Sequence, residues 1–475
     1  MQFNSWVFPH FFALVYAVYL TLGKRRFRLQ NAWLLAASYV FYGYWDPRFL
    51  ALLALSTGID FVLGKKLAAS EDERVRKRLV TLSVVVNLGI LASFKYFNFF
   101  LASTAVFLKK IGLEADLPTL RLLLPVGISF YTFQTLSYTI DVYRRRMPAT
   151  NDLLGFALFV SFFPQLVAGP IERASRLLPQ ISAPRDVTAG KVQAGIWLLV
   201  WGYFKKTVMA DQAALISNPL FADGTWQELS GLEPLLAVLG FTIHIYCDFS
   251  GYSDIARGLA KLLGFEFLLN FRLPYLATGP SDFWARWHVS LSTWLRDYLY
   301  IPLGGNRGSR FKTYRNMFLV MALGGLWHGA AWPYVLWGSY HGVLLVLERV
   351  ILDVRGKAPN ERDYGLVGEW VRIVLFWVPM LIGMAIVKCV SVEQFWHLFT
   401  NQSLALSDRA AEGFVTLAYF SWPLVVVQLA QHCSKDLLVP LRLPAVGRGL
   451  LVAFLVAAMM VFGVREPVEF FYFQF

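Results

Sequence analysis

A histidine flanked by glycines is the side chain in this sequence best suited to chemistry. His328 follows the apolar run 317–327 and lies within Gly324-Gly325-Leu326-Trp327-His328-Gly329. An ionisable group at the end of an apolar segment is costly to bury, so it indicates a function by default. Imidazole also gains and loses its proton near neutral pH, which suits a general base. The alternative is a structural histidine that hydrogen-bonds a backbone carbonyl or a neighbouring helix.

A second histidine, His288, closes the sequence Ser281-Asp282-Phe283-Trp284-Ala285-Arg286-Trp287-His288. If this segment is helical, residues four apart share a face, which places Trp284 beside His288 and pairs Asp282 with Arg286. The pattern predicts an aromatic segment at a membrane interface that contributes to the site. The alternative is an amphipathic helix lying on the membrane surface with tryptophan anchors.

The segment 281–342 gathers polar, charged and aromatic residues that the rest of the chain avoids. Its arginines suit the phosphates of coenzyme A or anionic lipid headgroups. An ordinary basic loop on the cytoplasmic side is the alternative. The predicted donor-binding or tunnel residues are Trp284, Arg286, Trp287, Arg296, Asp297, Asn306, Arg307, Trp327, Trp337 and His341.

A third polar group consists of His244, Asp248 and Asp254 in an otherwise apolar setting. The spacing of His244 and Asp248 suits a hydrogen bond within one helix. It is one residue shorter than the His-x4-Asp motif of soluble-type glycerolipid acyltransferases. We therefore predict a structural polar cluster here and not a second reactive centre.

Several kinds of site are missing from the sequence. It has no Gly-x-Ser-x-Gly elbow, Walker loop, His-Glu-x-x-His pair or dinucleotide fingerprint, which argues against hydrolases, ATPases, zinc proteases and dehydrogenases. Cys247, Cys389 and Cys433 are too widely spaced for a zinc site or a disulfide framework. We expect no metal and no bound cofactor.

The composition places these residues in a membrane. Hydrophobic residues make up 57% of the 475 residues and charged residues only 16%, well outside the range of soluble domains. Trp and Tyr are spread along the chain, as expected for many crossings of the membrane interface. The net charge of +13 comes from lysines and arginines in short loops between apolar runs. We interpret it as a topology signal and not as nucleic-acid binding.

The apolar runs predict about 11 to 14 membrane segments, several of them shorter than the roughly 20 residues of a perpendicular span. Some contain Pro or paired Gly, so we expect tilted and re-entrant helices around a cavity. The basic clusters 24–28 and 65–78 face one side, which the positive-inside bias makes cytoplasmic, with the amino terminus outside. The predicted segments are 7–22, 32–44, 49–64, 79–92, 94–108, 122–138, 153–168, 192–210, 235–246, 317–327, 334–347, 371–387, 414–429 and 450–464.

The two histidine segments, Phe283-Trp284-Ala285-Arg286-Trp287-His288 and Gly324-Gly325-Leu326-Trp327-His328-Gly329, resemble the membrane-bound O-acyltransferase family. The resemblance extends from the first span to the aromatic run 471–475. It implies an all-α polytopic fold with tilted helices in a ring around a central funnel or tunnel. It also implies one membrane domain over 1–475, with peripheral helices at about 1–115, a catalytic core at about 120–350 and C-terminal helices at about 365–475. In the family pattern His328 is catalytic and His288 is an auxiliary residue near the cytoplasmic entrance.

Within the family the chain is most similar to the branch that O-acetylates a bacterial exopolysaccharide such as alginate. This similarity implies an O-acetyltransferase of the bacterial inner membrane, surrounded by lipid, that uses a cytosolic thioester such as acetyl-CoA. The acceptor would be the polymer or a hydroxyl on a periplasmic acetyltransferase or relay protein. One alternative is transfer of D-alanine from a carrier protein to teichoic acid. Another is a proton-coupled transporter or export channel in which His328 is a relay.

Overall fold

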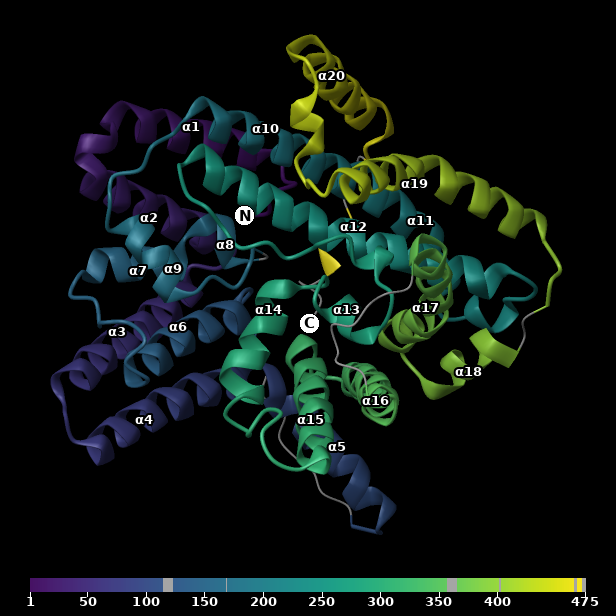
Figure 1. The fold of residues 1–475 in the computed structure, drawn as a ribbon, viewed down its shortest axis with the longest axis horizontal. Helices are drawn as coiled ribbons and strands as arrows, with labels where there is room; N and C mark the ends of the chain where they lie inside the picture. The colour runs from purple at the N-terminus through teal and green to yellow at the C-terminus, as the bar shows by residue number, and fades with distance from the viewer. Residues whose placement is uncertain (114–122, 168, 357–364, 401–402, 465–467, 472–475) are drawn as a thin grey trace. The chain divides into compact units, whose positions relative to one another are not determined.

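The computed structural model describes residues 1–113, 123–167, 169–356, 365–400, 403–464 and 468–471. The described residues form α-helices joined by short 3-10 and π turns, and no β-strand (Figure 1). The predicted all-α fold is therefore confirmed. Residues 472–475 of the terminal aromatic run lie outside the described part.

Six helices in the described ranges are long and apolar enough to cross a membrane, and the bent pair formed by residues 7–22 and 24–43 makes up to seven. The remaining helices are shorter or more polar. The six are Glu73–Lys110, Glu233–Leu262, Trp332–Val354, Gly365–Lys388, Asp408–Ser434 and Ala445–Phe462.

The chain divides into two compact units, which we describe separately. The first comprises Met1–Gly195 and Ala256–Leu268, and the second Ile196–Ile255 and Leu269–Phe475. Helices α10 (Ala189–Phe204) and α12 (Glu233–Leu262) contribute residues to both. The other helices of the first unit are α1 (Val7–Leu22), η1 (Lys24–Arg26), α2 (Phe27–Gly43), α3 (Arg48–Ala69), α4 (Glu73–Leu91), η2 (Ala92–Tyr96), α5 (Phe97–Lys110), α6 (Ile128–Tyr143), α7 (Leu153–Ser161), α8 (Phe163–Leu166) and α9 (Ala174–Ile181).

The second unit carries both histidine motifs. Its helices are η3 (Lys205–Ala210), α11 (Asp211–Leu220), η4 (Trp226–Glu228), η5 (Pro274–Leu276), α13 (Pro280–Trp284), α14 (Val289–Leu295), η6 (Arg296–Tyr300), α15 (Arg310–His328), α16 (Trp332–Val354), α17 (Gly365–Lys388), α18 (Val392–Thr400), α19 (Asp408–Ser434), η7 (Val439–Arg442) and α20 (Ala445–Phe462).

The predicted spans 79–92 and 94–108 belong to one helical run in the structure. Helix α4 continues through the π turn η2 into α5, and the whole run, Glu73–Lys110, has 38 residues. No proline lies between the two apolar stretches, so nothing forces the first helix to end. The structure therefore has one helical run where the sequence predicts two spans.

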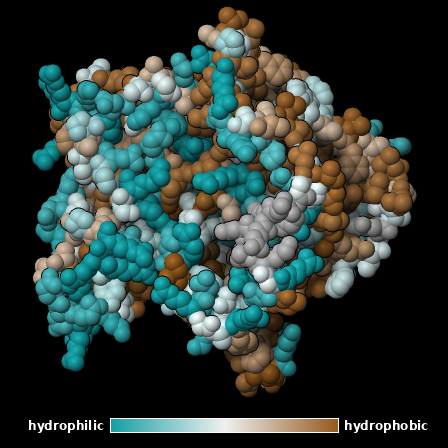
Figure 2. All heavy atoms as spheres, viewed as in Figure 1, coloured by the Kyte–Doolittle hydropathy of each residue, from teal (hydrophilic) through white to brown (hydrophobic). Residues whose placement is uncertain are grey.

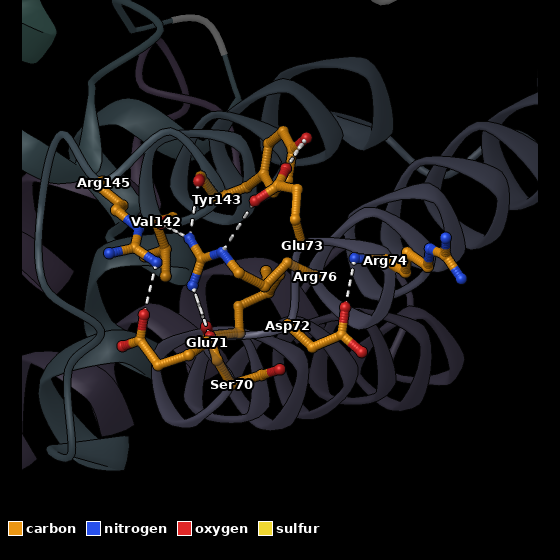
Figure 3. Close-up of polar contacts among 10 residues, drawn as sticks. Ser70, Glu71, Asp72, Glu73, Arg74, Arg76, Val142, Tyr143 and Arg145 are labelled. Atoms are coloured by element: carbon orange, nitrogen blue, oxygen red, sulfur yellow. Dashed lines mark hydrogen bonds and ion pairs between the residues drawn. The ribbon is translucent and has the colours of Figure 1, made fainter.

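A buried arginine ties helix ends together in the first unit. The guanidinium of Arg76 is almost inaccessible and donates hydrogen bonds to the carbonyl oxygens of Ser70, Val142 and Tyr143 (Figure 3). It also donates to the carbonyl oxygen of Leu67. These carbonyls lie at the ends of α3 and α6, where the helix itself supplies no donor. Arg76 belongs to the basic cluster that the topology prediction uses, yet its folded role is structural.

Apolar side chains cover the outer surfaces of α19 and α20 (Figure 2). At least half of the surface of each of the following side chains is exposed: Val415, Trp422, Leu450, Phe454 and Met460. A continuous exposed apolar surface of this kind marks contact with a membrane. Lipid is the expected neighbour of these two helices.

Candidate active site

The two histidine motifs meet in the second unit. The ring centroids of His288 and His328 lie 6.0 Å apart, and both side chains are buried. His328 is the last residue of α15, whereas His288 lies between α13 and α14. The two histidines selected from separate stretches of sequence are therefore neighbours.

The helix that begins at Pro280 does not reach His288. Helix α13 ends at Trp284, and His288 has a φ of 43°, in the left-handed region that histidine adopts more readily than most residues. The predicted ion pair is present, with 2.9 Å between Arg286 Nε and Asp282 Oδ1. The predicted shared face of Trp284 and His288 is wrong, because the left-handed residue breaks the helical spacing and the two rings contact different aromatic neighbours.

Tryptophans surround the imidazole of His328. The rings of Trp327 and Trp337 each lie 5.1 Å from it, at 81° and 85°. Trp337 also contacts Trp284 at 5.6 Å and His341 at 5.2 Å. Edge-to-face contacts of this kind are favourable, and they surround the histidine with apolar surface. Five of the predicted site residues are thus brought together.

A small cavity of about 10 Å³ adjoins His328. That space admits about one water molecule or one methyl group. The indole N–H groups of Trp287 and Trp337, which also line it, are buried without an acceptor among the described residues. A polar group of a substrate could supply the partner that a buried indole N–H usually has. The remaining lining residues are Ile245, Tyr334, Met384, Val387 and Phe471.

His288 is held in its neutral form. It lies in a connection between short helices, outside the segments long enough to span a membrane. Burial, with a further contribution from the neighbouring His328, lowers the pKa of His288 well below its ordinary value. A neutral imidazole has one nitrogen that donates and one that accepts a hydrogen bond. His288 can therefore orient a neighbouring group without adding charge to the site.

Glycines bring α15 and α16 into backbone contact beside the site. A methyl group added at Gly325 would collide with the carbonyl oxygen of Tyr334, and one at Gly338 with the carbonyl oxygen of Met321. His328 follows Gly325 by three residues, less than one turn of α15. The close crossing therefore fixes the position of the imidazole.

Replacing Gly338 by Ala is expected to force the two helices apart. Overpacking of this kind costs about 1–3 kcal/mol, so the thermal midpoint in detergent should fall, and any activity that depends on His328 should fall with it. Gly89→Ala is the matched control, because nothing lies within 4 Å of a methyl group at that helical position. Equal midpoints for the two variants would show that the crossing tolerates a side chain.

A larger pocket of about 630 Å³ lies against α15. Arg296 and Asn306 of the predicted donor-binding set line it, whereas Asp297 bonds to Arg296 at 2.8 Å and Arg307 is exposed outside the lining. Met321 lies seven residues before His328 on the same helix, about 10 Å along its axis. The other lining residues are Ser281, Ser292, Tyr300, Ile301, Thr313, Met317, Val320, Leu345, Arg349 and Leu352.

A fully buried ionic network lies in the same unit. Lys206 Nζ is 2.7 Å from Asp211 Oδ1 and 2.9 Å from Asp248 Oδ1, and all three side chains are 0% exposed. Lys206 belongs to the π turn η3, a form of helix that is rare and often found at functional sites. Asp248, predicted as part of a polar cluster, thus pairs with a lysine.

The rest of the predicted polar cluster is dispersed. Asp254 Oδ2 pairs with Lys205 Nζ at 2.7 Å. The ring nitrogens of His244 have no hydrogen-bond partner in the described part of the chain, so the bond to Asp248 that their spacing allows is not made. The structural role assigned to these residues stays a prediction. Among the described residues no three His, Cys, Asp or Glu side chains could together hold a metal ion.

Reasoning from the sequence missed several residues at these sites, among them Arg349, Lys206 and Phe471. The first two carried a usable signal, because a basic residue within or beside an apolar run is costly. Phe471 carried none, since it is one of 40 phenylalanines in the chain.

The chain is similar to known membrane-bound O-acyltransferases. The model of the membrane-bound O-acyltransferase family matches residues 77–391. The chain is 42% identical over 401 residues to the probable alginate O-acetylase AlgI of Pseudomonas aeruginosa, covering 84% of this chain and 74% of the relative. Identity to the AlgI of Pseudomonas syringae pv. tomato is 44% over 410 residues, 86% of this chain and 74% of the relative. The peptidoglycan O-acetyltransferase of Helicobacter pylori is 35% identical over 343 residues, 67% of this chain and 64% of the relative.

Proposed function

The chain belongs to the membrane-bound O-acyltransferase family, as a multi-pass membrane acyltransferase, and from that premise we propose that it acetylates an exopolysaccharide such as alginate. The acetyl group would come from acetyl-CoA in the cytosol and cross the membrane through this protein. The names of the alginate O-acetylases that it resembles support the acceptor class.

One observation carries the proposal more than any other. The imidazole of His328 lines a cavity about the size of a methyl group and is in contact with the rings of Trp327 and Trp337. A thioester carbonyl next to that imidazole would be in a water-poor space, where hydrolysis competes poorly with transfer. The ring centroid of the neutral His288 lies 6.0 Å from that of His328.

The reaction transfers an acetyl group from the thioester sulfur of coenzyme A to a hydroxyl oxygen of the acceptor. The acceptor hydroxyl oxygen attacks the acetyl carbonyl carbon, the C–S bond breaks, and coenzyme A leaves as a thiol. His328 takes the hydroxyl proton and passes it to the departing sulfur. In an alternative mechanism a ring nitrogen of His328 attacks the acetyl carbonyl carbon, the C–S bond breaks, and coenzyme A leaves with the proton of the imidazole as a thiol. The acceptor hydroxyl oxygen then attacks the same carbon, the C–N bond breaks, and the hydroxyl proton returns to the ring nitrogen.

The 630 Å³ pocket supports acetyl-CoA as the donor. Arg296 and Arg349 supply positive charge, and a row of apolar side chains on α15 continues toward His328. Guanidinium groups suit phosphates because they offer several donors in one plane. Arg349 is part-buried and bonds Asp353 at 3.0 Å through Nη2, while its Nε has no hydrogen-bond partner among the described residues.

Removing Arg349 is expected to weaken donor binding. A hydrogen bond to a charged group contributes about 1.5–3 kcal/mol, so Arg349→Ala should raise KM for acetyl-CoA about 10-fold or more with a smaller change in kcat. Arg355→Ala, an exposed arginine at the end of the same helix, is the control. Steady-state transfer of radiolabelled acetyl groups measures both, and an unchanged KM in Arg349→Ala would exclude this pocket as the phosphate site.

We place the chain in the bacterial inner membrane with its amino terminus in the periplasm, in accord with the basic clusters 24–28 and 65–78. The acetyl group would pass to a periplasmic acetyltransferase or relay protein, or directly to the polymer.

Reconstituted vesicles test the function and its rivals together. Purified protein is supplied on one side with acetyl-CoA or with a D-alanyl carrier protein, both radiolabelled, and on the other with alginate and the periplasmic partner. Labelled alginate from acetyl-CoA alone supports the proposal. Labelled D-alanyl ester would assign the chain to teichoic-acid chemistry, and substrate flux without acyl turnover would assign it to transport.

A further inference from the structure

We infer that Phe471 forms one wall of the active site and limits the transferred acyl group to about two carbons. The inference rests on the proposed function, since it assigns the size of the acyl group at the same site. Phe471 belongs to the segment 468–471, which follows α20 and lies beside α12 in the second unit (Figure 1).

Phe471 belongs to the wall of the cavity that His328 lines. Its side chain is 6% exposed, and its ring centroid lies 5.4 Å from Phe241 and 6.3 Å from His244, both on α12. The cavity has a volume of about 10 Å³, which leaves room for about one methyl group. An acetyl group whose carbonyl carbon is at His328 has one methyl group to place, whereas a butyryl group has two further methylenes.

Buried polar contacts hold the segment in this position. The backbone N–H of Phe471 donates to Asp248 Oδ2 at 2.8 Å, and Lys206 Nζ donates to the carbonyl oxygen of Val468 at 2.8 Å. Asp248 and Lys206 pair with each other in the buried network. The ionic network therefore fixes the backbone on both sides of residues 469 and 470, so Phe471 cannot readily withdraw.

Two further bonds attach the chain just before this segment. Gln212 Nε2 donates to the carbonyl oxygen of Phe462 at 2.9 Å, and the N–H of Val464 donates to the carbonyl oxygen of Thr207 at 3.3 Å. The end of α20 is therefore attached to the same π turn and helix that carry Lys206 and Asp211. The segment that carries Phe471 is therefore held against η3, α11 and α12 of the second unit.

The neighbouring phenylalanine has a different role. Phe470 is fully buried and lies against Tyr252, with ring centroids 4.1 Å apart. It does not line the cavity beside His328. Because the bonds to Asp248 and Lys206 hold the backbone of the segment, Phe470 serves as a control of the same residue type, one position from Phe471, whose ring does not line the cavity.

The test compares acetyl-CoA with butyryl-CoA in the same vesicles. Phe471→Ala should raise the ratio of butyryl to acetyl transfer about 10-fold or more, because one methylene in an apolar pocket changes the rate by about 10- to 200-fold. Phe470→Ala should keep the wild-type ratio. The ratio is measured within one preparation, so it does not depend on the amount of folded protein.

Each outcome bears on one claim. Wild-type protein that transfers no acetyl group from acetyl-CoA would contradict the proposed function. Acetyl transfer with an unchanged ratio in Phe471→Ala, or an equal rise in Phe470→Ala, would overturn the role of Phe471. If Phe471→Ala does not fold, Phe471→Leu replaces it, with a smaller rise in the ratio expected and no rise counting against the inference.

Discussion

Acetyl transfer is expected to fall about 100- to 10,000-fold when His328 is replaced by Ala, the factor that a positioned general base contributes. The substitution removes the imidazole that lines the small cavity and leaves the glycine crossing of α15 and α16 intact. The variant should therefore insert into membranes and elute from gel filtration like the wild type. Labelled acetyl groups transferred per minute in reconstituted vesicles measure the loss.

His10→Ala provides the control for His328→Ala. His10 is an exposed histidine on α1, and its loss should leave the rate unchanged. Transfer by His328→Ala near the wild-type rate would remove the catalytic assignment. A further measurement separates the two mechanisms. Wild-type protein is incubated with labelled acetyl-CoA in the absence of acceptor, and the reaction is quenched. Label bound covalently to the protein would show that His328 carries the acetyl group, because a general base forms no covalent bond to it.

The largest effect on stability is expected for Lys206→Ala. The change leaves Asp211 and Asp248 fully buried without their cation, and breaking a buried pair in this way costs about 3–5 kcal/mol. The thermal midpoint in detergent should drop sharply, or the yield of folded protein should collapse.

Two further variants serve as controls for the loss of stability in Lys206→Ala. Lys66→Ala removes an exposed lysine at the end of α3 and should change the free energy of unfolding by no more than about 0.5 kcal/mol. A triple variant, Lys206→Met with Asp211→Asn and Asp248→Asn, removes every charge of the network and should recover part of the stability. A midpoint for Lys206→Ala equal to that of Lys66→Ala would mean that the network contributes no net stability.

Apolar runs predicted the centres of the long helices but not their ends. The expected span 371–387 lies inside α17 (Gly365–Lys388), and 414–429 lies inside α19 (Asp408–Ser434). The additional turns contain polar residues that a search for apolar runs does not count. The ends depend on caps such as Ser407, whose hydroxyl accepts a hydrogen bond from the N–H of Ala410.

Only the part of the candidate site that is local in sequence was predicted. Trp327, Trp337 and His341 lie near His328 in sequence. Helical spacing puts Trp337 and His341 on one face of α16, and the glycine crossing brings that helix against α15. Phe471 reaches the same cavity from far along the chain. Its N–H donates to Asp248, and the nearby carbonyl of Val468 accepts from Lys206, contacts that no local pattern specifies. Contacts between residues so far apart in sequence can be identified only from the three-dimensional structure.

The left-handed backbone of His288 has a consequence for substitution experiments at that position. Most side chains lose about 1–2 kcal/mol in this conformation, whereas glycine adopts it freely and asparagine does so more readily than other residues. A defect seen with His288→Val or His288→Leu would combine the missing imidazole with conformational strain. His288→Asn and His288→Gly, compared side by side, separate the two contributions, so a saturation library should be normalised to those two variants and not to alanine.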